Sequence, residues 1–114
     1  MSEFSKLKCE ACRAGAPLVT AEELNQFLSV HSSWTLTDFE GVSIIQKTFK
    51  FGNFVDALAF TNTVGDMAEK EGHHPALLTE WGKVTVKWWT HKISGLHLND
   101  LIMGARTDEL YESK

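Results

Sequence analysis

The sequence predicts an α+β fold, a two-layer sandwich in which three helices pack on one face of a four-stranded antiparallel sheet. Three segments have helical periodicity, and residues suited to capping precede each of them. Four stretches of β-type pattern lie between these helices in two adjacent pairs, each pair joined by a tight turn. The expected order is therefore α-β-β-α-β-β-α, with antiparallel neighbours, because a tight turn reverses the chain direction.

The size and charge of the chain limit the classes of function. Its 114 residues, 43% of them hydrophobic, suit one domain, which we assign to residues 20–114, after an N-terminal extension at residues 1–19. The net charge is −4 and the basic residues are scattered, so no nucleic-acid surface is expected. No apolar run approaches the roughly 18 residues of a membrane span, and the N-terminus lacks the apolar region of a signal peptide. We therefore expect no membrane association and a cytoplasmic location.

The only cysteines, Cys9 and Cys12, form a C-x-x-C motif inside the extension. Two thiolates supply half of a structural zinc site, and the sequence offers no second pair. No strand precedes the motif, as a thioredoxin-like redox site would require. We expect an exposed, reduced pair without a catalytic role.

The first helix is expected to begin after Thr20, which forms a capping box with Glu23. Its expected buried face follows the i, i+3, i+4, i+7 spacing and consists of Leu24, Phe27, Leu28 and His31. Alternation from Trp34 to Thr37 then predicts a strand that turns at Glu40 and Gly41.

The second strand, Val42 to Phe51, has a less regular pattern. Ile44 and Ile45 are consecutive apolar residues, so their side chains point to opposite faces. Either both faces of this strand are partly covered, or a bulge shifts the register near Ile44.

The second helix is expected to begin after Asn53, with Asp56 in its first turn, and to stop at Gly72. We expect close packing along a stripe of mostly small residues, Leu58, Thr61, Gly65 and Ala68.

The second pair of strands begins with the alternating residues 77–81, and Gly82 and Lys83 are expected to form its two-residue turn. One face of the next strand is lined by Val84, Val86 and Trp88. His91 closes this strand on the other face, which it shares with Trp89.

The last helix is expected from about Leu98 to Tyr111, with Asp100 in its first turn and His97 at the cap position. Its expected inward face consists of Leu98, Leu101, Ile102 and Ala105.

Three histidines at element ends are candidates for proton transfer. His73 and His74 follow the second helix, and His91 ends the fourth strand. Imidazoles gathered around one cavity can exchange protons near pH 7 without a cofactor. Glu69 lies in the last helical turn, where the helix dipole disfavours a negative charge. It could orient an imidazole, accept a hydrogen bond from a ligand, or be only a solvated acid.

Four short motifs together resemble the pterin-4a-carbinolamine dehydratases. They are E-K-E-G-H-H-P at 69–75, E-W-G-K-V-T-V at 80–86, T-H at 90–91 and G-L-H-L-N-D-L at 95–101. The resemblance covers roughly residues 20–112 and is specific because residue types, spacings and element order agree together. The N-terminal segment around Cys9 and Cys12 resembles an extension of bacterial members.

The resemblance implies a lyase that dehydrates 4a-hydroxytetrahydrobiopterin to quinonoid dihydrobiopterin. This reaction regenerates the tetrahydrobiopterin of phenylalanine hydroxylase, the implied functional companion. The family implies no metal and no cofactor, and its members form dimers or tetramers, so a homo-oligomer is expected.

By matching position, the resemblance assigns catalysis to His73, His74 and His91, with Glu69 beside them. It assigns a substrate-binding role to Asp100, although Asp100 could also serve only as a helix cap. A flat pterin needs an apolar wall, and the candidates for it are Leu77, Trp81 and Trp89.

Two other classes of function stay open. Exposed edge strands and the small-residue stripe suit an oligomerisation module, and animal members of the family also act as dimerisation partners of a transcription factor. A histidine-rich metal carrier is a further alternative, which would retain stoichiometric metal after purification.

Overall fold

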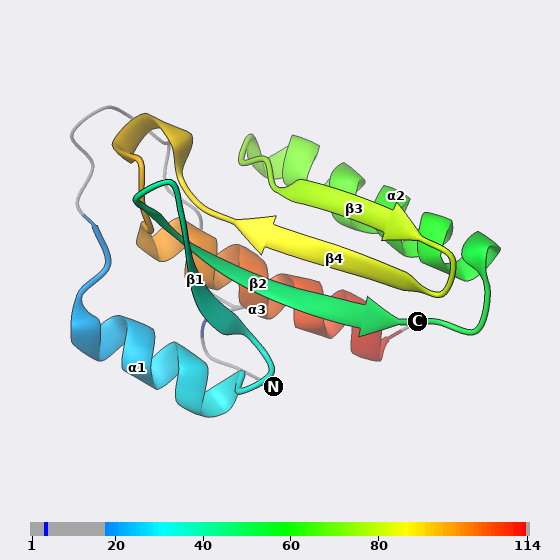
Figure 1. Ribbon diagram of the computed structural model, residues 1–114, viewed down its shortest axis with the longest axis horizontal. Coiled ribbons are helices and arrows are strands. Elements are labelled where there is room, and N and C mark those ends of the chain that lie inside the picture. Colours follow the sequence, from blue (N-terminus) through cyan, green and yellow to red (C-terminus); the bar gives the residue numbers. More distant parts are fainter. Residues whose placement is uncertain (1–3, 5–17, 114) are drawn as a thin grey trace.

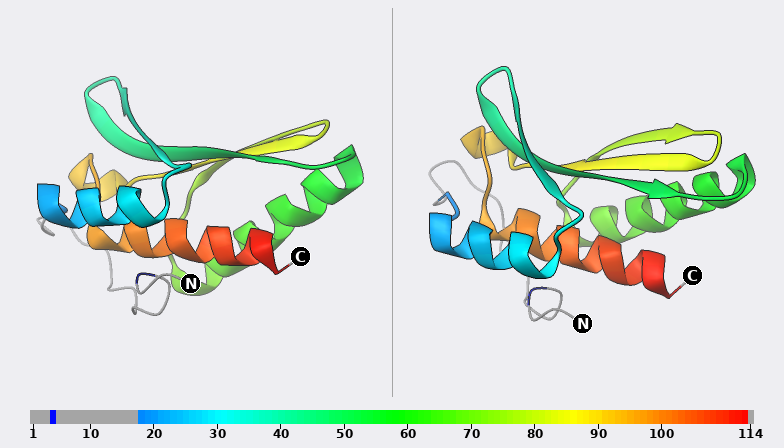
Figure 2. Two further views of the ribbon diagram at one scale, coloured as in Figure 1. Left: turned by 90° about the horizontal axis from the view of Figure 1, so that it is seen from below. Right: turned by 60° about the horizontal axis from the view of Figure 1, so that its bottom comes forward.

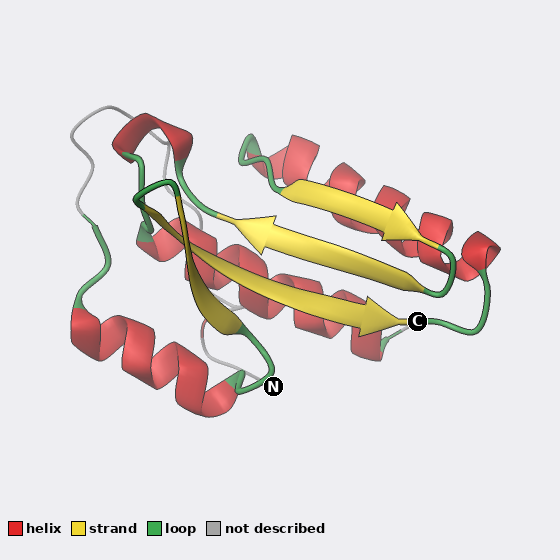
Figure 3. Cartoon of the chain, in the orientation of Figure 1, coloured by secondary structure: helices red, strands yellow, loops and turns green. Residues whose placement is uncertain are grey.

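The computed structural model describes Phe4 and residues 18–113, so Cys9 and Cys12 lie outside the described residues. The predicted α+β fold and its order are confirmed (Figures 1 and 3). The helices and strands are α1 (Ala21–Val30), β1 (Thr35–Phe39), β2 (Val42–Lys50), α2 (Phe54–Glu71), β3 (Ala76–Glu80), β4 (Lys83–Trp88) and α3 (Leu98–Glu112). A short 3-10 helix, η2 (His91–Ile93), joins β4 to α3.

The four strands pair in the order β1-β2-β4-β3, with every neighbour antiparallel. The β2–β4 ladder runs without a slip from Ile45 opposite Trp88 to Lys50 opposite Lys83. The β1–β2 ladder is equally regular. The bulge considered near Ile44 is therefore absent from these ladders. Both faces of β2 are partly covered instead, since Ile44 and Ile45 are both buried.

All three helices pack on one face of the sheet (Figure 2). The β4 side chains on this face, Val84, Val86 and Trp88, are fully buried. The opposite face carries no helix, and we call it the open face. The β1–β2 hairpin curves away from the helix layer, which makes the open face concave at this end (Figure 2).

Local capping signals predict the helix ends correctly. Thr20 Oγ1 accepts the Glu23 N–H at 3.0 Å, and Glu23 accepts the Thr20 N–H at 2.9 Å, so the capping box is present. Asn53 caps α2 by accepting the Asp56 N–H. Gly72 ends α2 with a φ of 68°, a left-handed conformation that suits glycine.

Two expectations about the fold are wrong in detail. The turn between β3 and β4 consists of Trp81 and Gly82, and Lys83 already pairs with Glu80 in the ladder. The positive φ of Gly82, 77°, explains why the turn centres there. The buried stripe of α2 is Ala57, Phe60, Val64 and Ala68, rotated from the expected one. Phe60 and Val64 bury more apolar area than Thr61 and Gly65, which decides the rotation.

No helix among the described residues is long and apolar enough to cross a membrane.

Candidate active site

His73 lies under the end of the sheet, immediately after the glycine that ends α2. Its ring stacks on Trp88 with centroids 5.7 Å apart and planes 5° apart. Its Nε2 lies 2.6 Å from Asp100 Oδ1 in the first turn of α3. The His73 side chain is 5% exposed and that of Asp100 is 0% exposed. The imidazole is therefore fixed on both its flat face and its edge.

Asp100 joins two distant stretches of the chain. Besides His73, it accepts the Thr90 hydroxyl at 2.7 Å and the His97 backbone N–H at 2.9 Å. Three groups from different parts of the chain therefore surround one carboxylate, and each of them can donate a hydrogen bond to it. Because Asp100 is fully buried, this geometry favours positioning of His73 over direct contact with a ligand.

The cap position of α3 supports this carboxylate. His97 is buried, and its Nδ1 accepts the Asn99 N–H at 3.0 Å. The expected cap role of His97 is therefore confirmed. Thr90 and the His97 backbone complete a network that sequence reasoning did not identify, although Thr90 directly precedes His91 in the T-H motif.

His74 and Glu69 form a second His–carboxylate pair, and both of its side chains are largely exposed to solvent. His74 Nε2 lies 2.8 Å from Glu69 Oε1, with side-chain exposures of 62% and 81%. Glu69 is thus placed to orient the His74 imidazole, one of the alternatives left open by the sequence. An exposed pair of this kind holds its geometry only weakly.

His91 begins η2, three residues beyond the last residue of β4, so the expectation that it closes the strand is wrong. The strand stops because Thr90 leaves the β4 ladder and forms an isolated bridge to Gly95. The exposed His91 ring stacks on Trp89 with centroids 4.4 Å apart and planes 20° apart. Trp89 therefore supplies the flat surface against which this imidazole rests.

The three histidines lie around one end of β4. Trp88 and Trp89 are consecutive, so their side chains point to the helix side and the open side. His73 contacts the first tryptophan and His91 the second. Ala76 pairs with Lys87 at the end of the β3–β4 ladder, and His74 lies two residues before Ala76, so it is near the same end of β4. Asp100 ties Thr90, the neighbour of His91, to His73.

A pocket of about 420 Å³ adjoins this end of β4 on the open face. We call it the open-face pocket, and its lining residues are Phe39, Glu40, Val42, Ile44, Ala76, Lys87 and Trp89. Its volume lies within the usual range of small-molecule sites. Trp89 both lines the pocket and stacks on His91.

Two of the three expected wall residues lie elsewhere within one copy of the chain. Trp81 is 72% exposed in the β3–β4 turn, at the end of β3 opposite to the histidines. The five residues of β3 separate the two ends by roughly 17 Å. Leu77 packs against the helix-side core. Of the three, Trp89 is the one that lines the open-face pocket, whereas Leu77 lies on the helix side, as His73 does.

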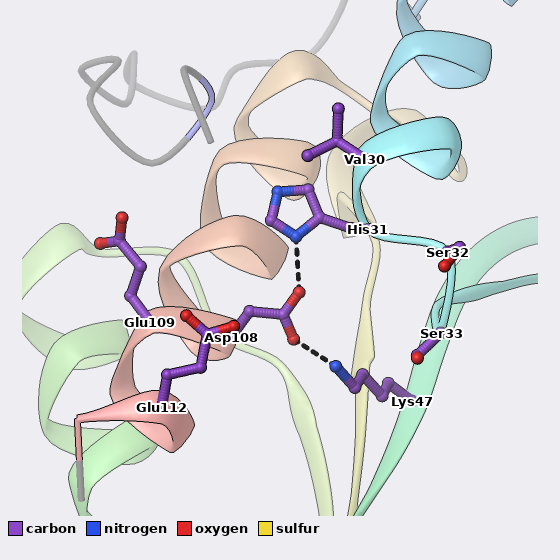
Figure 4. A pocket seen from close by; sticks show the side chains of 8 residues that line it. All are labelled: Val30, His31, Ser32, Ser33, Lys47, Asp108, Glu109 and Glu112. Atoms are coloured by element: carbon purple, nitrogen blue, oxygen red, sulfur yellow. Dashed lines mark hydrogen bonds and ion pairs between the residues drawn. The ribbon is translucent and has the colours of Figure 1, made fainter. Parts of the chain in front are cut away.

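A second charged cluster surrounds Asp108 of α3 (Figure 4). Asp108 lies about two helical turns after Asp100. Asp108 accepts from His31 Nδ1 at 2.5 Å, Trp34 Nε1 at 3.0 Å and Lys47 Nζ at 2.6 Å. These side chains bind one another at the junction of α1, β2 and α3, so we interpret the cluster as structural, although His31 Nε2 is buried without a hydrogen-bond partner among the described residues. In the described part of the chain, no group of three or more His, Cys, Asp or Glu side chains is arranged to hold a metal ion.

Comparisons with known proteins converge on one family. The family model described as pterin 4 alpha carbinolamine dehydratase matches residues 17–110. A relative from Microcystis aeruginosa, provisionally named pterin-4-alpha-carbinolamine dehydratase, is 54% identical over 114 residues, 100% of this chain and 98% of that protein. A relative of the same provisional name from Syntrophotalea carbinolica is 56% identical over 112 residues, 98% of this chain and 100% of that protein. The crystal structure of a transcriptional coactivator/pterin dehydratase from Brucella melitensis superposes with a TM-score of 0.73 at 27% identity, covering 83% of this chain and 99% of that one.

Proposed function

The chain belongs to the pterin 4 alpha carbinolamine dehydratase family, and from this premise we propose that it dehydrates 4a-hydroxytetrahydrobiopterin to quinonoid dihydrobiopterin and water. The observation that carries the proposal is the Asp100 carboxylate, which joins the His73 stretch to the Thr90–His91 stretch. Two imidazoles from distant parts of the chain thereby lie at one end of one strand, His73 against Trp88 on the helix side and His91 against Trp89 on the open side.

The reaction needs one acid and one base. Protonation of the 4a-hydroxyl allows the C4a–O bond to break and water to leave. Loss of the N5 proton then forms the C4a=N5 double bond of the quinonoid product. One proton is taken up and one is released, so the histidines return to their starting states after a proton exchange with water.

We assign this proton exchange to His73 and His91, with His74 binding the pterin ring. Asp100 is a positioning residue, because it holds the His73 ring in one orientation and one tautomer. Trp88 restricts the same ring from its flat face. His91 is exposed on Trp89, where it can exchange protons with both ligand and solvent.

The direct test is the dehydration assay. We expect the purified chain to accelerate loss of water from the 4a-carbinolamine by at least about 10²-fold over buffer alone, since general acid-base groups supply this much. Stopped-flow absorbance of carbinolamine generated in situ measures the rate. A rate equal to the spontaneous one would overturn the proposed activity.

Glu69→Gln is expected to reduce turnover less than about tenfold. The Glu69–His74 pair is largely exposed, and exposed pairs contribute little because water screens them. Steady-state kinetics of the carbinolamine reaction measure the effect, with Asp66→Asn, an exposed acid on the same helix, as the matched control. A loss as large as that caused by removing His91 would contradict this assignment.

We further propose that the chain works in the cytoplasm as a homo-oligomer beside a pterin-dependent phenylalanine hydroxylase. The chemistry supports the companion, because a 4a-hydroxypterin is the product of a hydroxylation in which the pterin takes one oxygen atom. Dehydration returns that pterin to a form that a reductase can recycle.

A second candidate function is an oligomerisation or coactivator module that needs no catalysis. The Brucella melitensis protein is described by both activities, which favours this alternative. The first turns of α2 expose apolar side chains that could contact a partner, namely Phe54, Val55 and Leu58. A flat dehydration assay together with a stable assembly would favour the module.

A further inference from the structure

The Trp88 indole, which supports the His73 ring, is itself held by a side chain of α3. Its Nε1–H donates to Thr107 Oγ1 at 3.2 Å, and the Thr107 hydroxyl donates to the Met103 carbonyl at 2.7 Å. A hydroxyl has one proton to donate, so its lone pairs are left to accept from the indole. Trp88 and Thr107 are both 0% exposed, so water cannot replace either partner. The rotation of the indole ring therefore depends on this hydroxyl.

Two side chains of α3, which runs beneath β2 and β4 (Figures 1 and 2), hold the His73 imidazole from two sides. Asp100 binds the Nε2 edge of the ring directly at 2.6 Å. Thr107 holds the indole that covers the flat face of the ring. Thr107 follows Asp100 by seven residues, or about two helical turns, so both side chains lie on one face of α3. One rigid helix thus sets the distance between the two supports.

A valine in place of Thr107 would fill the same space without placing a hydroxyl in the core. Burial of a hydroxyl lowers stability unless the group is hydrogen-bonded. The Met103 carbonyl does not need this hydroxyl, because in an α-helix it already accepts the backbone N–H four residues later. What the hydroxyl adds is an acceptor for the indole N–H of Trp88.

We propose that Thr107 is a positioning residue for the dehydration, which acts on His73 through the Trp88 indole. Nε2 is the ring nitrogen farther from Cβ, so rotation of the ring about χ2 tilts the imidazole while it moves Nε2 little. The Asp100 bond at Nε2 therefore leaves this tilt poorly defined, whereas the indole, parallel to the imidazole within 5°, defines it. Proton transfer needs an aligned donor and acceptor, so the tilt affects the chemical step. This inference rests on the proposed function for the identity of the reaction.

Thr107→Val is expected to lower kcat about tenfold and to leave KM unchanged. The loss of one hydrogen bond to the indole corresponds to about this factor, whereas Thr107 is fully buried and contacts no ligand. Thr107→Ser restores a hydroxyl and should recover most of the loss. The matched control is Thr63→Val, which also removes a hydroxyl bonded to the carbonyl four residues earlier, but on the exposed surface of α2. This control should keep the wild-type kcat. Steady-state kinetics of the carbinolamine measure all variants, at a temperature where circular dichroism shows them folded.

A double-mutant cycle separates positioning from packing. Trp88→Phe keeps an aromatic ring beside His73 but has no N–H. If Thr107 acts through the indole N–H, adding Thr107→Val to Trp88→Phe should lower kcat no further. A further loss of about tenfold in the double variant would overturn the proposal. A folded Thr107→Val variant that is less stable but keeps the wild-type kcat would also overturn it, because Thr107 would then serve stability alone.

The His73 ring gives a second readout that needs no turnover. The ring current of a stacked indole shifts the NMR signals of the carbon-bound imidazole protons. Proton–carbon spectra of the full chain should therefore show displaced His73 signals, which move toward those of the exposed His74 in Thr107→Val. Such movement in a chain without dehydratase turnover would support the positioning of the ring and overturn the proposed activity. Turnover in the wild type, with unchanged His73 signals in Thr107→Val, would support the activity and overturn this inference.

Discussion

His91→Ala is expected to lower dehydratase turnover about 10²- to 10⁴-fold, the usual contribution of one positioned acid or base. The His91 side chain is exposed and stacks on Trp89, and it makes no hydrogen bond or ion pair with any described residue, so its removal should leave the fold intact. Steady-state turnover of the carbinolamine measures the loss, and a urea unfolding curve checks the stability. An unchanged unfolding midpoint would locate the effect in the chemistry.

His73 requires a more conservative exchange, because it is buried against Trp88 and bonded to Asp100. His73→Gln keeps an N–H that can donate to the carboxylate but cannot exchange a proton near pH 7. We expect a loss of turnover in the same range as for His91→Ala, with a folded protein. Unchanged turnover in the double variant His73→Ala, His91→Ala would refute the assignment of acid and base to this pair.

Much of the fold was predictable because its signals are local. Thr20 and Glu23 form the capping box within four residues, and Gly72 ends α2 by its own backbone freedom. The rotation of α2 was not predictable in this way. Leu58 and Phe60 are both apolar, and contact with residues far along the chain decides that Phe60 is buried.

The candidate site was predictable only in part, because it too depends on contacts between residues that are far apart in the sequence. The histidines stand at element ends, which the sequence shows, whereas their partners lie across the fold. His73 bonds to a residue 27 positions away, and the residue type at position 100 alone does not distinguish a helix cap from a positioning carboxylate. The open-face pocket is lined by residues of the β1–β2 turn and by Trp89. These residues are far apart in the sequence, so no local sequence pattern predicts the pocket.

Asp108→Ala is expected to reduce the free energy of unfolding by about 3 to 5 kcal/mol, the largest effect on stability expected for one exchange. The side chains of Lys47 and Asp108 are mostly buried, at 19% and 8% exposure. Without the carboxylate, the Lys47 ammonium and the Trp34 indole N–H stay in the protein without their acceptor. The total free energy of unfolding of a small domain is about 5 to 15 kcal/mol, so the variant should be only marginally stable.

The matched control for this exchange is Glu112→Ala. Glu112 lies on the same helix and lines the same pocket as Asp108 (Figure 4), but it is exposed and makes no ion pair with any described residue. Its loss should change stability by less than about 0.5 kcal/mol. Urea denaturation followed by tryptophan fluorescence measures both variants. If Asp108→Ala costs no more than this control, the three hydrogen bonds do not hold α1 and β2 to α3, and the stability of this junction comes from the packing of Phe27 and Trp34 instead.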